Sequence, residues 1–114
     1  MIIKKLADAR FKDMPDHEDI TKQIVIGPED GSTEIVLRYF RVGPGGSSPY
    51  HRHDFPHLVK LEAGKGVVLD PEGIEHPLVP GDYVYIHDNE PHCFKNTGPE
   101  FLEFICIVPV RGEG

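Results

Sequence analysis

Three of the chain's seven histidines, His51, His53 and His57, stand close together in the stretch PYHRHDFPHL at positions 49–58. Side chains on an extended strand alternate between its two faces, so the odd-numbered His51 and His53 point the same way. His57 joins them if strand pairing resumes in register after residues 54–56. Imidazole is the commonest metal-binding side chain, and three imidazoles on one wall would be costly in an ordinary core. The spacing therefore predicts a metal site, for which the rest of the chain must supply a further ligand and a cavity.

The other four histidines differ in how well they could supply that ligand. His17 follows a Met-Pro-Asp break and is expected to be an exposed loop residue. His76 precedes a proline in a short strand and His87 abuts an Asp-Asn turn, so both are expected at the surface. His92 opens a strand after a proline and shares a face with Phe94. A lone histidine in that position is weak evidence for a metal ligand. The spacing of His92 from other residues makes the evidence stronger, as described below.

Length and charge exclude several classes of protein. A chain of 114 residues can bury one hydrophobic core but not two, so a single domain is expected. The net charge of −7 argues against a nucleic-acid partner, whose phosphates need a basic surface, and against an anionic membrane surface. No apolar run approaches the roughly 20 residues that span a bilayer. The opening residues MIIKK lack the apolar segment of a signal peptide, so a cytoplasmic location is expected.

Short β-rich segments separated by dispersed glycine and proline predict an all-β fold. Residues 1–19 are charged and weakly periodic, and we expect an extended arm with at most a short strand near 1–5. Strands are expected at 20–26, 34–42, 57–62, 67–69, 74–79, 83–86, 92–96 and 101–109, with a loop at 43–49. No stretch has helical periodicity over the roughly 10 residues that a helix requires. About eight to ten strands of this kind predict a closed barrel or a double-sheet jelly roll.

Side-chain parity indicates which residues could line a cavity inside such a barrel. Phe104 and Cys106 share one face of the last strand and Glu103 lies on the other, so Phe104 and Cys106 are expected inside. Phe94 shares a face with His92, and Tyr50 is expected at the lip of the cavity. The alternative is that these side chains simply fill the barrel core, as inward side chains of small barrels usually do.

Arg38 lies between Val36 and Phe40 in the expected strand 34–42, both faces of which are mixed. The pattern alone does not decide which face is inside. If the Arg38 face points inward, only an anionic partner would justify burial of the guanidinium. The alternative is an exposed charge on the outer face.

Two spaced motifs connect the histidines to a known family. The first is G-x5-H-x-H-x3-H-x6-G, formed by Gly45, His51, His53, His57 and Gly64. The second is P-G-D-x9-H-x3-N, formed by Pro80, Gly81, Asp82, His92 and Asn96. Together they resemble the paired motifs of the cupin superfamily, small β-barrels built as a jelly roll. The resemblance implies one cupin domain over residues 1–114, with the barrel and both motifs at 42–108.

The resemblance also implies a set of metal ligands. His51, His53 and His92 fall on the three histidine positions of the family, and His57 falls where the family usually has glutamate. The chain looks like a single-domain subgroup that has this substitution and binds one divalent transition metal ion through four histidines. The subgroup implies manganese or iron, whereas intrinsic affinity for imidazole favours nickel, copper or zinc over manganese. It also implies a homodimer, in which the N-terminal arm could add a strand to a neighbour's sheet edge.

Three functions follow from such a site. Four neutral imidazoles leave the charge of the metal uncompensated, so an anionic small-molecule ligand is expected at its open positions. With no ligand carboxylate to act as a base, the leading hypothesis is a mononuclear metalloenzyme that oxidises or dioxygenates a small organic molecule. The first alternative is a non-catalytic ligand-binding or sensing protein. The second is a metal-dependent isomerase or lyase, which needs Tyr50, Arg38 or His87 for proton transfer. A purely structural, tetrahedral zinc is the remaining alternative for the metal.

Overall fold

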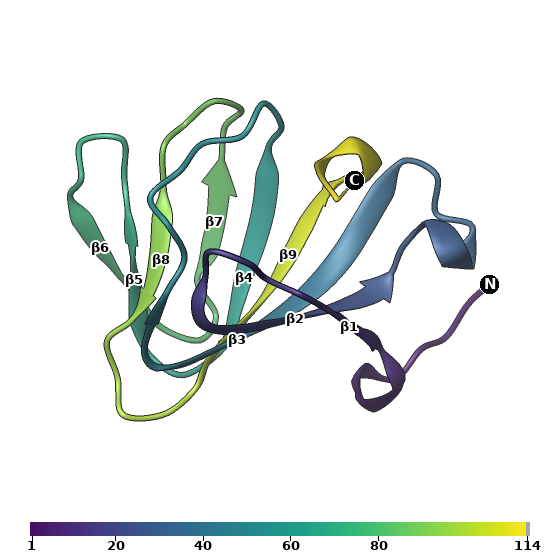
Figure 1. The fold of residues 1–114 in the computed structure, drawn as a ribbon, viewed down its shortest axis with the longest axis horizontal. Coiled ribbons are helices and arrows are strands. Elements are labelled where there is room, and N and C mark those ends of the chain that lie inside the picture. Colours follow the sequence, from purple (N-terminus) through teal and green to yellow (C-terminus); the bar gives the residue numbers. More distant parts are fainter. Residues whose placement is uncertain (114) are drawn as a thin grey trace.

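The computed structural model describes residues 1–113, which form strands joined by short turns (Figure 1). The strands are β1 (Arg10–Lys12), β2 (Glu18–Ile26), β3 (Ile35–Ser47), β4 (His57–Ala63), β5 (Gly66–Leu69), β6 (Glu75–Leu78), β7 (Tyr83–Ile86), β8 (Cys93–Asn96) and β9 (Leu102–Pro109). Three single 3₁₀ turns accompany them: η1 (Leu6–Asp8), η2 (Pro28–Asp30) and η3 (Val110–Gly112). Nothing in the described part of the chain forms a helix with the length and apolar character to cross a membrane. The all-β prediction is confirmed.

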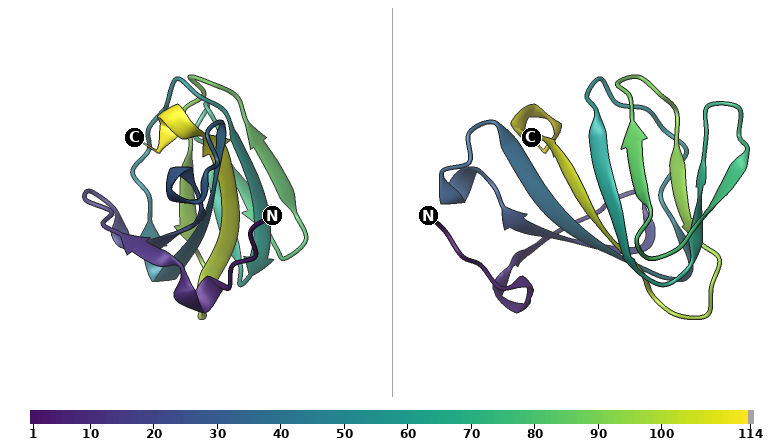
Figure 2. Two further views of the ribbon diagram at one scale, coloured as in Figure 1. Left: turned by 90° about the vertical axis from the view of Figure 1, so that its right-hand side faces the viewer. Right: turned by 180° about the vertical axis from the view of Figure 1, so that it is seen from behind.

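The nine strands form one antiparallel sheet that curls on itself (Figures 1 and 2). Its order is β6-β5-β8-β3-β9-β4-β7, with β2 on the other edge of β3 and β1 beyond β2. The curl brings Phe94 of β8 against Phe104 of β9, with ring centroids 4.8 Å apart, although β3 separates these two strands in the sheet order. The result is the predicted jelly-roll barrel, with one inner face that holds the core.

Strict alternation on β9 and β3 settles which side chains point into the barrel. Every even-numbered residue of β9 is buried, which confirms that Phe104 and Cys106 lie inside. The even-numbered residues of β3 from 36 to 42 are buried as well, because β3 pairs with β9 in a register that aligns Arg38 with Cys106. Arg38 therefore lies inside, with 7% of its surface exposed.

Glycines in both motifs lie at turns that a larger residue would strain. Gly64, between β4 and β5, has a φ of +82°, and a Cβ there would lie 2.2 Å from the backbone oxygen of Phe101. Gly81 has a φ of +94° in the turn before β7. These positions favour glycine because it has no Cβ to clash in left-handed backbone. The motif glycines thus make the tight turns that return strands to the barrel.

Two boundaries differ from the sequence prediction. The arm has its strand at 10–12 rather than near 1–5, because β1 pairs with β2 and the Gln23 side chain donates to the carbonyls of Leu6 and Ala9. The predicted loop 43–49 is largely strand, because β3 continues through Ser47 to pair with Glu18 and Lys95. The glycines that suggested a loop allow close approach instead: a Cβ on Gly46 would lie 2.6 Å from the backbone oxygen of Glu18.

Candidate metal centre

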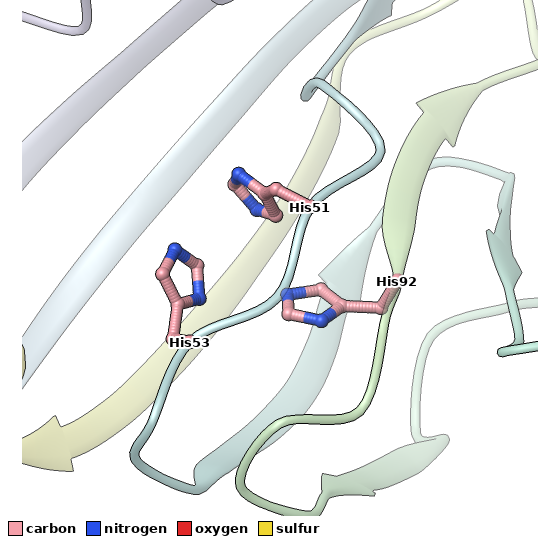
Figure 3. Close-up of side chains that lie close together, drawn as sticks. All are labelled: His51, His53 and His92. Carbon is pink, nitrogen blue, oxygen red and sulfur yellow. The ribbon is translucent and has the colours of Figure 1, made fainter.

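Three of the predicted ligands, His51, His53 and His92, converge on a common point (Figure 3). His51 and His53 come from the segment between β3 and β4, and His92 directly precedes β8. The backbones of His51 and His92 exchange two hydrogen bonds of 3.0 and 2.8 Å, which fixes the two residues opposite each other. One ring nitrogen from each of the three histidines lies within 4.8 Å of the other two.

This spacing fits a metal ion. A metal–imidazole bond is about 2.1 Å long, so two nitrogens on opposite sides of one ion lie about 4.2 Å apart. Small side-chain rotations would therefore bring the three nitrogens to bonding distance. The Nδ1 atom of His53 is also buried without a hydrogen-bond partner within residues 1–113, so no hydrogen bond holds that nitrogen away from an ion. The three histidines can hold a metal ion.

The fourth predicted ligand, His57, lies beside this group but outside it. Its ring centroid is 5.1 Å from that of His53 and 5.0 Å from that of His92. It is the first residue of β4 and is 6% exposed, and its Nδ1 is buried with no hydrogen-bond partner in the described chain. The three-histidine group does not include His57, so the predicted four-histidine site is not confirmed.

The imidazoles are held in the neutral form that a metal ligand requires. Burial, reinforced by the neighbouring His53 and His92, lowers the pKa of His51 from 6.5 to about 4. Burial and the same kind of crowding lower the pKa of His57 to about 3. Burial is also the largest cause that lowers the pKa of His53 and of His92. Neutral imidazoles at neutral pH do not have to release a proton before they bind a metal ion.

Neighbouring groups orient two of the rings. Nδ1 of His92 lies 2.9 Å from the backbone oxygen of Glu90, so it donates a hydrogen bond and leaves Nε2 free as an acceptor for an ion. The His53 ring stacks on Phe55 at 4.9 Å with an interplanar angle of 19°. Both contacts limit rotation of the rings and so favour one arrangement of the ligand nitrogens.

The four histidines line a cavity of about 340 Å³, at the small end of the range for ligand pockets. Three stacked phenylalanines form much of its apolar wall, with Phe104 between Phe40 and Phe94 at 5.1 and 4.8 Å. The complete lining is Asp13, Met14, Pro15, His17, Ile20, Lys22, Arg38, Phe40, Ser48, His51, His53, Phe55, His57, His92, Phe94, Phe104, Cys106 and Gly112.

The cavity includes most of the predicted pocket residues. Arg38, Phe94, Phe104 and Cys106 all line it. Tyr50 was expected at its lip but does not line it: Tyr50 is 46% exposed, its hydroxyl donates to the backbone oxygen of Asp70, and it lines a separate surface depression beside Pro71 and Glu72. Tyr50 directly precedes His51, and neighbouring side chains of an extended chain point to opposite sides.

The surface predictions for two histidines are confirmed. His76 is exposed and lies 2.8 Å from the Asp70 carboxylate, and His87 is exposed against Tyr85. Both cysteines, Cys93 and Cys106, are buried and free, as expected of reduced thiols. Burial raises the pKa of the Cys106 thiol.

Sequence reasoning missed four residues that belong to this region. His17, expected in an exposed loop, lines the cavity with its ring 6.0 Å from that of His51. Phe55 lies in a break between strands, and Glu113 follows the last strand, so neither had a strand pattern to place it. The sequence did offer an indication for Lys22, because it lies between Ile20 and Ile24 on one face of its strand. Arg38 lies between apolar residues of its strand in the same way.

Fold and site together define a class: a small jelly-roll barrel with a histidine cluster in the wall of a ligand-sized cavity. The chain belongs to the cupin family, since the Cupin domain model matches residues 38–108, more than half of the chain. This match contains both histidine motifs.

Two curated relatives are similar to this chain. The 1-methylthio-D-xylulose 5-phosphate methylsulfurylase of Rhodospirillum rubrum is 34% identical over 89 residues, which are 78% of this chain and 55% of that protein. Auxin-binding protein 1 of Arabidopsis thaliana is 28% identical over 100 residues, which are 81% of this chain and 48% of that protein. The chain spans about half the length of these curated relatives.

Two solved structures resemble the fold over most of the chain. The polyketide cyclase RemF of Streptomyces resistomycificus superimposes with a TM-score of 0.89 at 26% identity, covering 96% of this chain and 80% of that one. A cupin-2 domain protein of Rhodospirillum rubrum superimposes with a TM-score of 0.74 at 32% identity, covering 89% and 66% of the two chains. The different activities in these names leave the reaction of this chain open.

Proposed function

We propose that this protein is a metal-dependent enzyme that acts on a small organic molecule bound in the histidine-lined cavity. One observation carries the proposal: His51, His53 and His92 bring neutral ring nitrogens together within 4.8 Å in the wall of an apolar cavity. His57 is proposed as the fourth ligand, because its ring lies about 5 Å from two of the others and its buried Nδ1 has no hydrogen-bond partner within residues 1–113.

The favoured reaction is oxidation or dioxygenation, with manganese or iron as the favoured metal. A bound metal ion would supply Lewis-acid or redox chemistry to a substrate oxygen. The chain's own residues bind and orient the substrate. The stacked rings of Phe40, Phe94 and Phe104 offer flat apolar contacts and exclude water, and Arg38 offers a cation to an anionic group. The histidine cluster contains no carboxylate, which favours this chemistry over one in which a metal-bound carboxylate acts as the base.

Metal content and oxygen consumption test this proposal together. Protein purified without added metal is expected to contain about one divalent transition metal ion per chain by elemental analysis. The loaded protein is then assayed for oxygen uptake with a panel of aromatic, enol and dicarboxylate compounds. His92→Ala should lose both metal and turnover, whereas the exposed His76→Ala should keep both. A loaded wild-type protein that consumes no oxygen with any compound would reject the oxidative reaction.

A second candidate is a non-redox reaction of a carbonyl compound, such as a cyclisation, isomerisation or elimination. The similarity to a polyketide cyclase, at a TM-score of 0.89 and 26% identity, favours it. Such a reaction needs a proton-transfer group. Tyr50 and His87 do not line the cavity, but Arg38 and His17 do, so His17 replaces them as the proposed proton carrier. Turnover of a polycarbonyl compound without oxygen, reduced by His17→Phe, would support this candidate.

The third candidate is ligand binding or sensing without turnover. It is supported by similarity to an oxalate-binding protein of Thermotoga maritima, 30% identical over 69 residues, which are 60% of this chain and 56% of that protein. A ligand that raises the melting temperature and is recovered chemically unchanged after long incubation would favour it. A ligand that is consumed would exclude it.

We also propose that the protein forms a homodimer in the cytoplasm. Support for the dimer comes from exposed apolar side chains on the outer face of the sheet: Leu58 of β4 pairs with Tyr85 of β7, and Tyr83 is 76% exposed beside them. Light scattering should give twice the 12.8 kDa of one chain. A mass of one chain would reject the dimer, and Tyr85→Lys should favour the monomer if this face is the interface.

A further inference from the structure

Two buried cations share the cavity with the histidines. Lys22 of β2 is 9% exposed and Arg38 of β3 is 7% exposed, and both line the cavity. The two strands pair so that Lys22 aligns with Phe40 and Arg38 aligns with Ile24, which places the cations diagonally on one inner face. Buried lysine and arginine are rare unless paired with an anion, so this arrangement requires a partner.

In the structure that partner is a carboxylate of the chain itself. Lys22 Nζ lies 2.8 Å from Oε2 of Glu113, and Arg38 Nη1 lies 3.3 Å from Oε1 of the same carboxylate. Exposed Lys12 also reaches Oε2 at 2.8 Å. The Glu113 side chain is 8% exposed, and its pKa is lowered by these cations despite its burial. Lys22 and Arg38 therefore already bind one buried carboxylate, each through one of its two oxygens.

Glu113 does not use up the binding capacity of the cations. Lys12, Lys22 and Arg38 together carry three positive charges against its single negative charge. Arg38 has five N–H donors. Its bonds besides Glu113 are a long one of 3.4 Å to the backbone oxygen of Cys106 and one of 3.0 Å to the Cys106 sulfur, a weak acceptor. A buried guanidinium with such partners is a ready site for a stronger acceptor.

The segment that carries Glu113 is attached by contacts that can be exchanged. It follows η3, where the N–H of Val110 donates to the backbone oxygen of Glu34 at 2.9 Å and Arg111 donates to the backbone oxygen of Asp54 at a long 3.4 Å. Gly112 lies against the Phe55 ring and lines the cavity. Withdrawal of Glu113 would thus open the cation pair on the side of the cavity that Gly112 lines.

We propose that Lys22 and Arg38 form a carboxylate-binding subsite of the cavity, and that Glu113 occupies it until the carboxylate of a small, flat, apolar ligand takes its place. The three stacked phenylalanines favour an aromatic body for this ligand. The proposal extends the proposed function. It rests on that function only for the direction of the rest of the ligand, which points toward the histidines. The binding of the carboxylate itself depends on Lys22 and Arg38 alone.

Calorimetric titration of metal-loaded protein with benzoate, and with benzamide as the neutral counterpart, tests the subsite. Glu113→Gln replaces the competing carboxylate with a neutral amide, which forms weaker hydrogen bonds to Lys22 and Arg38. Benzoate should therefore bind about tenfold more tightly to this variant. Lys22→Met and Arg38→Met should weaken benzoate about 30-fold or more, and benzamide little. The matched controls are Arg41→Met and Lys60→Met, in which outward-facing cations are removed from β3 and β4.

The outcomes separate this subsite from the metal site. Equal affinity for benzoate and benzamide, or no tightening in Glu113→Gln, would overturn the subsite. Benzoate binding that is lost in the double variant His51→Ala/His53→Ala but unchanged in Lys22→Met would also overturn it, by assigning the carboxylate to the metal. If the wild-type protein binds no metal, the proposed function fails, whereas the responses to Glu113→Gln and Lys22→Met still decide the subsite. Circular dichroism of each variant verifies that it is folded.

Discussion

The histidine cluster and the Lys22–Arg38 pair line the same cavity but are assembled from the chain in different ways. Three of the histidines fall within seven consecutive positions, and the fourth joins them through one backbone bridge between His51 and His92. The cationic pair and its carboxylate come from β2, from β3 and from the residue after η3, with up to 91 positions between bonded partners. Most of the first group is a local motif, whereas the second exists only in the folded barrel.

The two groups also favour ligands of opposite charge. Burial keeps the four histidines neutral, which suits a cation. Lys22 and Arg38 are instead paired with the Glu113 carboxylate, although burial lowers the pKa of Lys22, and so suit an anion. Arg38 connects them electrostatically, since its charge contributes to lowering the pKa of His53 and of His57. A ligand with a carboxylate at one end and an oxygen at the other could satisfy both groups at once.

The largest expected effect is the loss of metal when the local motif is broken. Loss of a group that merely orients a metal ligand costs about 10- to 100-fold in affinity, so His51→Ala/His92→Ala should lower metal affinity by more than about 100-fold. Competition with a chelator measures the affinity. The control His76→Ala/His87→Ala removes two exposed histidines and should change it little. Equal losses in the two double variants would show that metal binds elsewhere.

Substitutions in the Lys22–Arg38 pair should lower the free energy of unfolding rather than the affinity for metal. Removing one partner of a fully buried ion pair costs about 3–5 kcal/mol, but Lys12 and Lys22 would still pair with Glu113, so we expect about 1–3 kcal/mol for Arg38→Met by urea unfolding. The control Arg41→Met, on the opposite face of β3, should cost less than about 1 kcal/mol.

A double variant isolates the pair itself. The loss in Arg38→Met/Glu113→Gln should be smaller than the sum of the two single losses, because the Arg38–Glu113 contact can be lost only once. A double variant as unstable as the sum of the two single variants would mean that Arg38 acts through packing, including its contact with the Phe40 ring at 5.1 Å, and not through Glu113.

The contrast between the two groups explains what the sequence could predict. The barrel, its strands and the inward direction of Phe104 and Cys106 followed from alternation and turn residues, and the histidines from their spacing. Tyr50 was misplaced because its assignment rested on its place next to His51, whereas alternation puts neighbouring side chains on opposite sides of an extended chain. His17 and Glu113 were missed because their partners lie far away in sequence, where neither spacing nor parity reports a contact. Parity did place Lys22 between Ile20 and Ile24, but it could not identify the distant Glu113 as its partner.

Acid unfolding separates the two groups by pH. The pKa values of His51 and His57 fall from 6.5 in the unfolded chain to about 4 and about 3 in the folded one, so the unfolded state binds more protons between these values. Their contribution to stability is complete above about pH 6.5 and is lost as the pH falls from there. The pKa of Glu113 is lowered from 4.5, so its contribution is lost only below about pH 4.5.

Urea unfolding of metal-free protein at a series of pH values measures this difference. His57→Phe should flatten the loss of stability between pH 6.5 and 4.5, and Glu113→Gln should change the profile only below that window. A profile that is unchanged by His57→Phe would contradict the assignment of a buried, neutral His57.

The smallest expected effect comes from the contact of Gly112 with the Phe55 ring, beside the histidine cluster. A Cβ on Gly112 would lie 2.6 to 3.0 Å from ring atoms of Phe55, and the Phe55 ring stacks on His53. Because this ring can move, Gly112→Ala should cost about 1 kcal/mol or less while shifting Phe55. Metal affinity should then fall by less than about tenfold, a limit that corresponds to about 1.4 kcal/mol. The control Gly98→Ala adds the same methyl group next to Lys65, away from the cavity lining.

In a Phe55→Leu background the effect of Gly112→Ala on metal affinity should disappear, because the stacked ring that carries it is gone. An unchanged effect in that background would mean that η3 reaches the histidines by another route.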